Sequence, residues 1–307
     1  MGLGESDVFE VIDWVKRHYT IDERRIYLIG WSMGGHGTWR LGSLYPDVFA
    51  AATPVCGWPK PETVPNMRNL PTYPQHGAVD WVVPVSYSRM GTEILQRDAA
   101  PVVYDELPEA GHGLWIDSRE VGVLKRMFRH TLDPEPAEVH ITAKHPRYSR
   151  MYWAEITRWD DPHSPATLEA QVLPGNTISL ALTNVARAEI DLPASRLEGT
   201  GSIEWMVNGK RRETERTDDL RYEVLIDTSV TVRPLTDEPE PEVRQYAPGS
   251  AANLYRGEPF AIVYGTQAAD TVLSNAIHAM AARASDWLWP GYDNGMEYGT
   301  ALSLIHI

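Results

Sequence analysis

Hydrophobic residues in positions 1–133 alternate between helical spacing and short unbroken runs. Residues 6–19 carry apolar side chains at every third or fourth position, which predicts an amphipathic helix. Residues 25–31 (RIYLIGW) form a continuous apolar run, the pattern of a strand buried on both faces of a parallel sheet. Three further strands are expected in 50–58, 69–77 and 101–107, and helices in 33–45, 86–98 and 117–132. This alternation of strand and helix predicts a parallel sheet flanked by helices, the α/β class.

From residue 134 onward, the pattern changes to strands that follow one another without helices. Seven strands are expected, in 137–145, 150–159, 166–173, 176–185, 203–213, 220–226 and 229–235. The pair Asn208-Gly209 lies inside the fifth of these runs, and such a pair suits the tight turn of a hairpin. Short strands with regular turn signals predict an antiparallel, all-β sandwich of the immunoglobulin-like (Ig-like) kind over 134–236.

A third region follows an acidic, proline-rich linker at 236–244. Residues 259–266 predict a buried strand and residues 268–287 a helix, which together make one βα unit. One such unit cannot bury a core of its own, so 237–301 is expected to be the start of a truncated α/β domain. Residues 302–307 (LSLIHI) resemble the read-through of a sequencing adaptor and are left out of the fold prediction.

The composition excludes several classes of function. Hydrophobic residues make up 43% of the chain, and no run approaches the roughly 18 apolar residues of a membrane span. The net charge of −14 disfavours nucleic-acid binding, which needs a basic surface. The single cysteine, Cys56, allows neither an intrachain disulfide nor a zinc site built on thiolates. His140 and His145 are expected to be structural, so no metal or other cofactor is predicted, and the oligomeric state stays open.

The strongest chemical signal is Gly30-Trp31-Ser32-Met33-Gly34, a match to the pattern G-x-S-x-G. In this motif the serine occupies a strained turn between a strand and a helix, and glycines two residues before and after it avoid a steric collision. The N-terminus of the helix directs N–H groups at a developing oxyanion, and the amide of Met33 would be one donor. The alternative is an ordinary glycine-rich turn, but the predicted strand and helix favour a nucleophile.

A serine nucleophile needs a base, and the base needs a carboxylate that orients it. Asp80 follows the strand predicted in 69–77, and His112 follows the strand predicted in 101–107. The carboxyl ends of parallel strands share one edge of the sheet, so both side chains can reach Ser32. The spacing predicts Ser32 as the nucleophile, His112 as general base and then general acid, and Asp80 as the orienting group.

Four other residues compete for these roles. His36 lies in the helix after the serine and is expected to point away, and His76 lies at a strand end, where it is expected to shape the turn. Asp117 and Glu109 lie on the loop of His112 itself and cannot easily orient it from a separate strand.

Tryptophan is the other residue type that suggests binding. Near the predicted site, four tryptophans either wall an aromatic pocket or pack the core, and both interpretations stay open: Trp31, Trp58, Trp81 and Trp115. In the expected sandwich, three tryptophans could line a sugar-binding face, but core packing is the more frequent use of tryptophan in such strands: Trp153, Trp159 and Trp205.

Four segments of 1–133 together resemble the second half of an α/β-hydrolase domain, similar to the prolyl oligopeptidase family and its esterase relatives. They are IDWVKRHYTIDERRIYLIGWSMGGHGTW, YPDVFAAATPVCG, QHGAVDWVVPVSYSR and LPEAGHGLW. The resemblance implies a serine hydrolase whose triad is Ser32, Asp80 and His112. It also implies that the family's first strands, and the loop that gives the second oxyanion donor, belong upstream of Met1.

A second departure from the family pattern bears on the substrate. Prolyl oligopeptidases carry a propeller ahead of the catalytic domain, whereas here β-rich sequence follows it. The expected activity is cleavage of an ester or peptide bond in a small molecule through an acyl-enzyme. The alternatives are a carboxylesterase of feruloyl or acetyl type without peptidase activity, and an inert hydrolase fragment that acts as a binding or structural module. The sandwich favours an extracytoplasmic setting, by analogy of fold alone.

Overall fold

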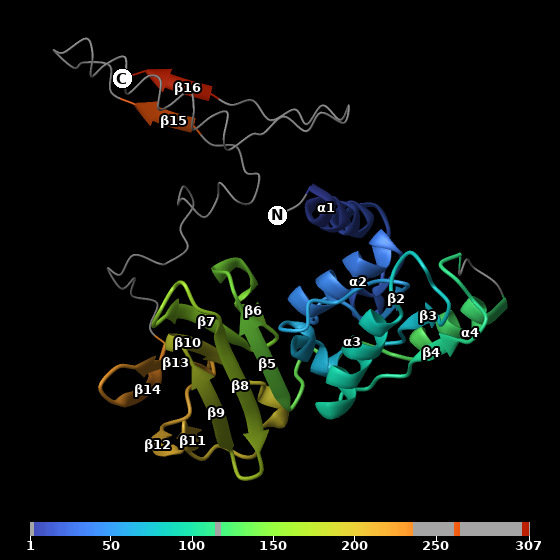
Figure 1. Ribbon diagram of the computed structural model, residues 1–307. Coiled ribbons are helices and arrows are strands. Elements are labelled where there is room, and N and C mark those ends of the chain that lie inside the picture. The colour runs from blue at the N-terminus through green and yellow to red at the C-terminus, as the bar shows by residue number, and fades with distance from the viewer. Residues whose placement is uncertain (1–2, 114–117, 236–260, 265–302, 307) are drawn as a thin grey trace. The chain divides into compact units, whose positions relative to one another are not determined.

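The computed structural model describes residues 3–113, 118–235, 261–264 and 303–306 (Figure 1). The chain divides into two compact units, Thr20–Gln245 and the pair of chain ends Met1–Tyr19 and Tyr246–Ile307. The unit of the chain ends contains helix α1 (Leu3–His18) and two strands that pair in parallel, β15 (Ala261–Tyr264) and β16 (Ser303–His306). The strand expected in 259–266 is thus present as β15, and β16 is formed by the adaptor-like residues. The helix expected in 268–287 lies outside the described residues.

The unit Thr20–Gln245 begins with a parallel four-stranded sheet in the order β1-β2-β3-β4 (Figure 1). Its strands are β1 (Tyr27–Trp31), β2 (Ala51–Val55), β3 (Gln75–Gly77) and β4 (Asp105–Leu107). The helices that accompany them are α2 (Met33–Leu44), α3 (Ser86–Arg97) and α4 (Ser118–Met127). All neighbouring strands pair in parallel, so the predicted α/β arrangement is confirmed and the four carboxyl ends share one edge.

Two predictions about these strands need correction. The strands predicted in 69–77 and 101–107 are shorter than expected, because Pro71, Pro74 and Pro101 have no N–H to donate to a ladder. In their first halves the sheet is reduced to isolated bridges at Thr72, and residues 64–69 form a 3₁₀ helix, η2 (Val64–Asn69). The second correction concerns β1, which was predicted to be buried on both faces. It is the outer strand of the described sheet and leaves Ile29 45% exposed, whereas β2 is buried along its whole length.

Two five-stranded sheets follow, in the orders β12-β11-β9-β8-β5 and β14-β13-β10-β7-β6 (Figure 1). The first sheet is built from β5 (Glu138–Ala143), β8 (Ala166–Leu173), β9 (Thr177–Thr183), β11 (Ile203–Val207) and β12 (Lys210–Thr214). The second is built from β6 (Arg150–Met151), β7 (Ala154–Trp159), β10 (Val185–Asp191), β13 (Arg221–Ile226) and β14 (Val230–Pro234). Three further 3₁₀ helices lie in the connections between these elements: η1 (Glu23–Arg25), η3 (Pro146–Tyr148) and η4 (Ala194–Arg196).

One hydrophobic core joins the two five-stranded sheets face to face. Trp205 on β11 and Tyr222 on β13 come from opposite sheets, and their ring centroids lie 5.1 Å apart. Trp153 and Trp159 are buried in the same core, so the prediction that the three sandwich tryptophans pack inside is confirmed. Cores of this kind are the usual result of packing the apolar faces of two sheets.

The sequence predicted a fully antiparallel sandwich, and this prediction is wrong for one pair of strands. Strand β11 pairs with β9 in parallel, because the chain crosses to β10 in the opposite sheet before it returns. The predicted hairpin is present between β11 and β12, where Asn208 and Gly209 have φ angles of 47° and 76°. Positive φ at both central residues is the requirement of the type I′ turn that suits Asn-Gly.

Polar contacts join the α/β part to the sandwich within this unit. Asn66 on η2 is buried, and its amide nitrogen donates to the carbonyls of Ser43 (2.9 Å) and Thr142 (3.1 Å). Its amide oxygen accepts from the backbone N–H of Thr142 at 2.7 Å. Thr142 lies on β5, the outer strand of its described sheet. Asn66 therefore takes the place of a neighbouring strand, because it satisfies both backbone groups of Thr142.

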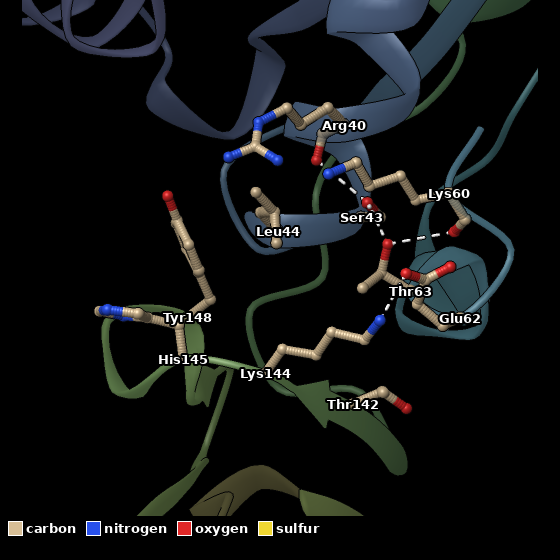
Figure 2. A pocket seen from close by; sticks show the side chains of 10 residues that line it. All are labelled: Arg40, Ser43, Leu44, Lys60, Glu62, Thr63, Thr142, Lys144, His145 and Tyr148. Atoms are coloured by element: carbon tan, nitrogen blue, oxygen red, sulfur yellow. Dashed lines mark hydrogen bonds and ion pairs between the residues drawn. The ribbon is translucent and has the colours of Figure 1, made fainter. Parts of the chain in front are cut away.

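A pocket of about 170 Å³ lies along the same seam (Figure 2). Its lining residues come from both parts: Arg40, Ser43, Leu44, Lys60, Glu62, Thr63, Thr142, Lys144, His145 and Tyr148. Several of the polar groups bind one another, since Lys144 pairs with Glu62 at 2.6 Å and the hydroxyls of Ser43 and Thr63 lie 3.2 Å apart. The pocket borders the second half of α2, whereas Ser32 precedes the first residue of that helix.

Replacing Asn66 with alanine is expected to lower the free energy of unfolding by about 3 kcal/mol, because buried backbone groups of Thr142 lose their partners. Asn69→Ala is the matched control, since half-buried Asn69 makes one comparable bond, from its side chain to the Glu138 carbonyl at 2.7 Å. Its loss should cost about 1 kcal/mol. Urea denaturation measures both values, and equal losses would contradict the role assigned to Asn66.

Candidate active site

Ser32 occupies a strained turn between β1 and α2. Strand β1 ends at Trp31, helix α2 begins at Met33, and Ser32 between them has φ 58° and ψ −114°. Its backbone N–H donates to the carbonyl of Val55 at 2.8 Å, which fixes the turn against the end of β2. A non-glycine residue with this backbone costs on the order of 1–3 kcal/mol, and such strain concentrates at functional sites. The strand, turn and helix that the G-x-S-x-G pattern requires are all present.

The glycines around Ser32 do not all have the role that the sequence predicted. A Cβ at Gly30 would lie 2.3 Å from the carbonyl oxygen of Gly34, so glycine is required there. A Cβ at Gly34 itself would meet no described atom within 4 Å, so the steric need expected at that position is absent. Gly35 is the tight position instead, because a Cβ there would lie 2.3 Å from the oxygen of Val55. The close approach of α2 to the end of β2 explains this shift by one residue.

Ser32, His112 and Asp80 meet at the carboxyl edge of the parallel sheet. Nε2 of His112 lies 2.8 Å from Oγ of Ser32, and Nδ1 of His112 lies 2.8 Å from Oδ2 of Asp80. The carboxylate can only accept, so Nδ1 carries the proton and Nε2 is left to accept from the serine hydroxyl. Each residue follows a different strand, β1, β4 and β3 respectively, as the spacing predicted.

The side chain of Asp80 has no exposed surface. Its Oδ1 accepts from the backbone N–H groups of Val82 (2.8 Å) and Val83 (2.9 Å), while Oδ2 faces His112. Burial by itself raises the pKa of Asp80, but the hydrogen bonds from His112 and from the two amides outweigh it, so the pKa lies below the usual value. Asp80 is therefore a carboxylate at neutral pH.

Backbone contacts hold the loop of Asp80 against the loop of His112. The N–H of Val79 donates to the carbonyl of Ala110 at 3.1 Å, and a Cβ at Gly77 would lie 2.2 Å from that same carbonyl oxygen. Trp31 donates from its indole N–H to the carbonyl of His112 at 2.9 Å, which ties the histidine loop to the end of β1. The relative positions of the three side chains are therefore set by the backbone.

The competing residues take other positions. Nδ1 of His36 lies 2.8 Å from the carbonyl of Trp58, and the two rings stack at 4.5 Å, so His36 points away from Ser32 as expected. Glu109 is exposed, and Asp117 lies outside the described residues. His76 does more than shape a turn, because its Nε2 lies 3.2 Å from Oδ2 of Asp80. The sequence signal for this contact was that Asp80 follows His76 by four residues at the end of one strand.

Cys56, to which the sequence assigned no role, lies beside the candidate triad. The thiol sulfur of Cys56 and ligand atoms of Asp80 and His112 all lie within 4.8 Å of one another. Cys56 follows β2, is buried, and has a φ of 47°. Burial raises the pKa of its thiol to about 11, so at neutral pH it is an uncharged neighbour of the carboxylate and not a nucleophile.

Large exposed apolar side chains are neighbours in the sequence of two residues of the candidate triad. Trp81 is 88% exposed and Met33 80% exposed, next to Asp80 and Ser32 in the sequence. Trp31 lies against His112, with ring centroids 5.0 Å apart. Of the four tryptophans with two interpretations, Trp31 contacts His112, Trp58 stacks on His36, and Trp81 is exposed. Trp115 lies outside the described residues.

Gly35→Ala is expected to lower the free energy of unfolding by about 3 kcal/mol, because its methyl group would overlap the carbonyl oxygen of Val55. Gly34→Ala serves as the neighbouring control and is expected to stabilise the fold by about 0.5–1 kcal/mol, as alanine does in a helix with space around it. Chemical denaturation of the two variants tests the assignment. A larger loss at position 34 than at position 35 would contradict it.

Comparison with known proteins finds similarities over parts of the chain. Residues 4–64 match the sequence model of the prolyl oligopeptidase family. An uncharacterized secreted protein of Arthroderma benhamiae is 32% identical over 115 residues, which cover 28% of this chain and 12% of that protein. A bifunctional acetylxylan esterase/xylanase of Neocallimastix patriciarum is 36% identical over 76 residues, 25% of this chain and 11% of that protein. Among solved structures, a thermostable esterase is 33% identical, with a TM-score of 0.40 over 42% of this chain and 37% of that one.

The matched residues coincide with the elements that hold the candidate nucleophile. Residues 4–64 include β1, the strained turn at Ser32, α2 and β2, whereas Asp80 and His112 lie beyond them. The match thus falls on the same strand, turn and helix from which the sequence pattern predicted a nucleophile. Over this segment the chain is therefore similar to the prolyl oligopeptidase family.

Proposed function

We propose that this chain is a serine hydrolase that cleaves carboxylic esters through an acyl-enzyme. Ser32 is the nucleophile, His112 the general base and then general acid, and Asp80 the carboxylate that orients the histidine. The observation that carries the proposal is the series of two 2.8 Å contacts from Asp80 through His112 to Oγ of Ser32. The strained turn at Ser32 supports it, because the turn exposes the hydroxyl at the start of a helix.

In the first step, Oγ of Ser32 attacks the carbonyl carbon of the ester while its proton passes to Nε2 of His112. The imidazolium that forms is stabilised through its Nδ1–H by the ionised carboxylate of Asp80. The carbonyl oxygen becomes an oxyanion. Helix α2 begins at Met33, and the first N–H groups of a helix have no acceptor within it, so the Met33 amide can donate to this oxygen.

In the second step, the bond between the carbonyl carbon and the alcohol oxygen breaks, and His112 gives its proton to the departing alcohol. The acyl group then remains on Oγ of Ser32. Water repeats the sequence: it loses a proton to His112 and attacks the acyl carbon, after which Ser32 leaves with that proton and the carboxylic acid is released. Atoms and charges balance without a cofactor.

The preference for esters over peptides rests on the relatives and on the chemistry of the leaving group. One matching relative is by name an acetylxylan esterase, whereas the family model bears the name of an oligopeptidase. An alcohol leaves more readily than an amine, so one well-placed histidine meets the demand of ester cleavage more easily than that of amide cleavage. The competing proposals are a peptidase and an inert binding module.

Two further proposals concern the β-rich part and the location of the protein. We propose that the two packed sheets form an Ig-like sandwich that supports the hydrolase part or presents substrate to it, since Asn66 and Lys144 join the two parts. An extracytoplasmic location is supported by the secreted relative. Among the described residues, no helix is both long and apolar enough to cross a membrane.

A fluorophosphonate probe is expected to label the full chain covalently at Ser32. The variant Ser32→Ala should not be labelled, and Ser86→Ala, which removes an exposed hydroxyl at the start of α3, should be labelled like the wild type. His112→Ala should slow labelling by about 10³–10⁴-fold, since the serine loses its base. Intact-protein mass spectrometry measures each rate. Equal labelling of the wild type and Ser32→Ala would remove Ser32 as the nucleophile.

The choice between ester and peptide is tested by two chromogenic substrates at the same enzyme concentration. The chain is expected to hydrolyse p-nitrophenyl acetate and to leave an N-acylated Xaa-Pro p-nitroanilide intact. Ser32→Ala is the control for each, because only activity lost in that variant belongs to the site. Hydrolysis of the anilide that Ser32→Ala abolishes would establish a peptidase instead.

A further inference from the structure

A second histidine lies behind the candidate triad. The side chain of His76, on β3, is completely buried, and both of its ring nitrogens have partners. Nε2 lies 3.0 Å from the carbonyl oxygen of Val83 and 3.2 Å from Oδ2 of Asp80. Nδ1 lies 2.7 Å from Oγ of Ser88 on α3. The ring therefore connects helix α3 to the carboxylate that orients His112.

These partners determine which nitrogen of His76 carries a proton. The carbonyl of Val83 and the carboxylate of Asp80 can only accept hydrogen bonds, so Nε2 must be protonated and donate. Burial lowers the pKa of His76, so the ring is neutral and Nδ1 has a lone pair. The hydroxyl of Ser88 can donate to that lone pair, and this bond selects the tautomer that presents Nε2–H to Asp80.

His76 adds a donor to those that bind the Asp80 carboxylate. A buried carboxylate needs donors for about four lone-pair sites. Oδ1 receives the N–H groups of Val82 and Val83, and Oδ2 receives Nδ1–H of His112. Oδ2 also lies 3.2 Å from Nε2 of His76. Without this donor the carboxylate would lose one of the two contacts that hold Oδ2 toward His112.

We propose that His76, with its tautomer set by Ser88, is a positioning residue that holds the Asp80 carboxylate in line with His112. The inference rests on the proposed function, because it concerns the same hydrolytic site. If His76 only stabilised the turn after β3, its hydrogen bond to the carbonyl of Val83 would be sufficient. The shared donation to Oδ2 goes further, since it fixes the oxygen atom on which the orientation of His112 depends.

The charge state of the neighbours makes a neutral histidine suited to this task. The titratable groups that act on His76 are Asp80, His112 and Glu106, the last of which lies on the adjacent strand β4. A cation beside Asp80 would cancel the negative charge that stabilises the His112 imidazolium. A neutral N–H donor instead holds the carboxylate in position and leaves that charge in place.

The experiment compares two amides that imitate different nitrogens of the ring. His76→Gln places an N–H donor near the position of Nε2 and can still bind Asp80, whereas His76→Asn reaches only the position of Nδ1 and can bind only Ser88. With p-nitrophenyl acetate, His76→Asn is expected to lower kcat by roughly 10- to 100-fold at little change in KM, as a displaced orienting group does. His76→Gln is expected to restore most of kcat. Equal kcat values for the two variants would overturn the proposal.

A proton NMR measurement separates this proposal from the proposed function. The proton between His112 Nδ1 and Asp80 should give a far-downfield resonance in the wild type and in His76→Gln, and the resonance should broaden or vanish in His76→Asn. If the wild type shows neither turnover nor labelling, the proposed function fails, while the resonance still reports on His76. An unchanged resonance in His76→Asn would overturn the positioning role.

Circular dichroism shows whether each variant is folded. If His76→Asn does not fold, Ser88→Ala takes its place, because it removes the hydroxyl that selects the tautomer and leaves His76 itself intact. This variant is expected to lower kcat at unchanged KM and to broaden the downfield resonance. Wild-type values of both quantities in Ser88→Ala would overturn the proposal.

Discussion

The hydrogen bond between His112 and the buried carboxylate of Asp80 is the interaction on which the rest of the site depends. A carboxylate with no exposed surface is unfavourable unless donors surround it, and Asp80 has two backbone amides on one oxygen and two imidazole N–H groups on the other. Of these donors, His112 alone changes its charge in the proposed reaction. The others are neutral, so they fix the position of the carboxylate without reducing its charge.

The backbone of the sheet edge carries the strain that this arrangement requires. Ser32 keeps its unfavourable turn because its N–H is bound by Val55 and because Gly35 lets α2 approach that same residue. Gly77 plays a comparable part on the other side, since it lets the loop of Asp80 pack against the loop of His112. Four strand ends therefore determine the geometry, and a shift of any one of them would separate the serine from its base.

The features that the sequence predicted are those that depend on order along the chain. Alternating strands and helices predicted the parallel sheet, and the positions of Ser32, Asp80 and His112 after successive strands placed them on one edge. The sequence did not predict His76 as a partner of Asp80, because that contact arises from a turn that folds the carboxylate back over β3. Gly35 was missed for a similar reason, since its constraint comes from β2 and not from its own helix. The parallel pairing of β9 with β11 depends on a crossing between sheets, which an alternating pattern does not encode.

At the seam between the α/β part and the sandwich, a few hydrogen bonds also fix the positions of larger elements. Asn66 supplies the hydrogen bonds of an absent neighbour to Thr142, so the outer strand β5 is closed by a side chain of the α/β part. An unprotected strand edge exposes backbone groups that invite pairing with other chains. Asn66 also binds the carbonyl of Ser43, which lies in the helix that begins at the candidate nucleophile. The buried amide of Asn66 thus connects strand β5 of the sandwich to helix α2, whose N-terminus is proposed to bind the oxyanion. The position of that helix therefore depends on contacts with both parts.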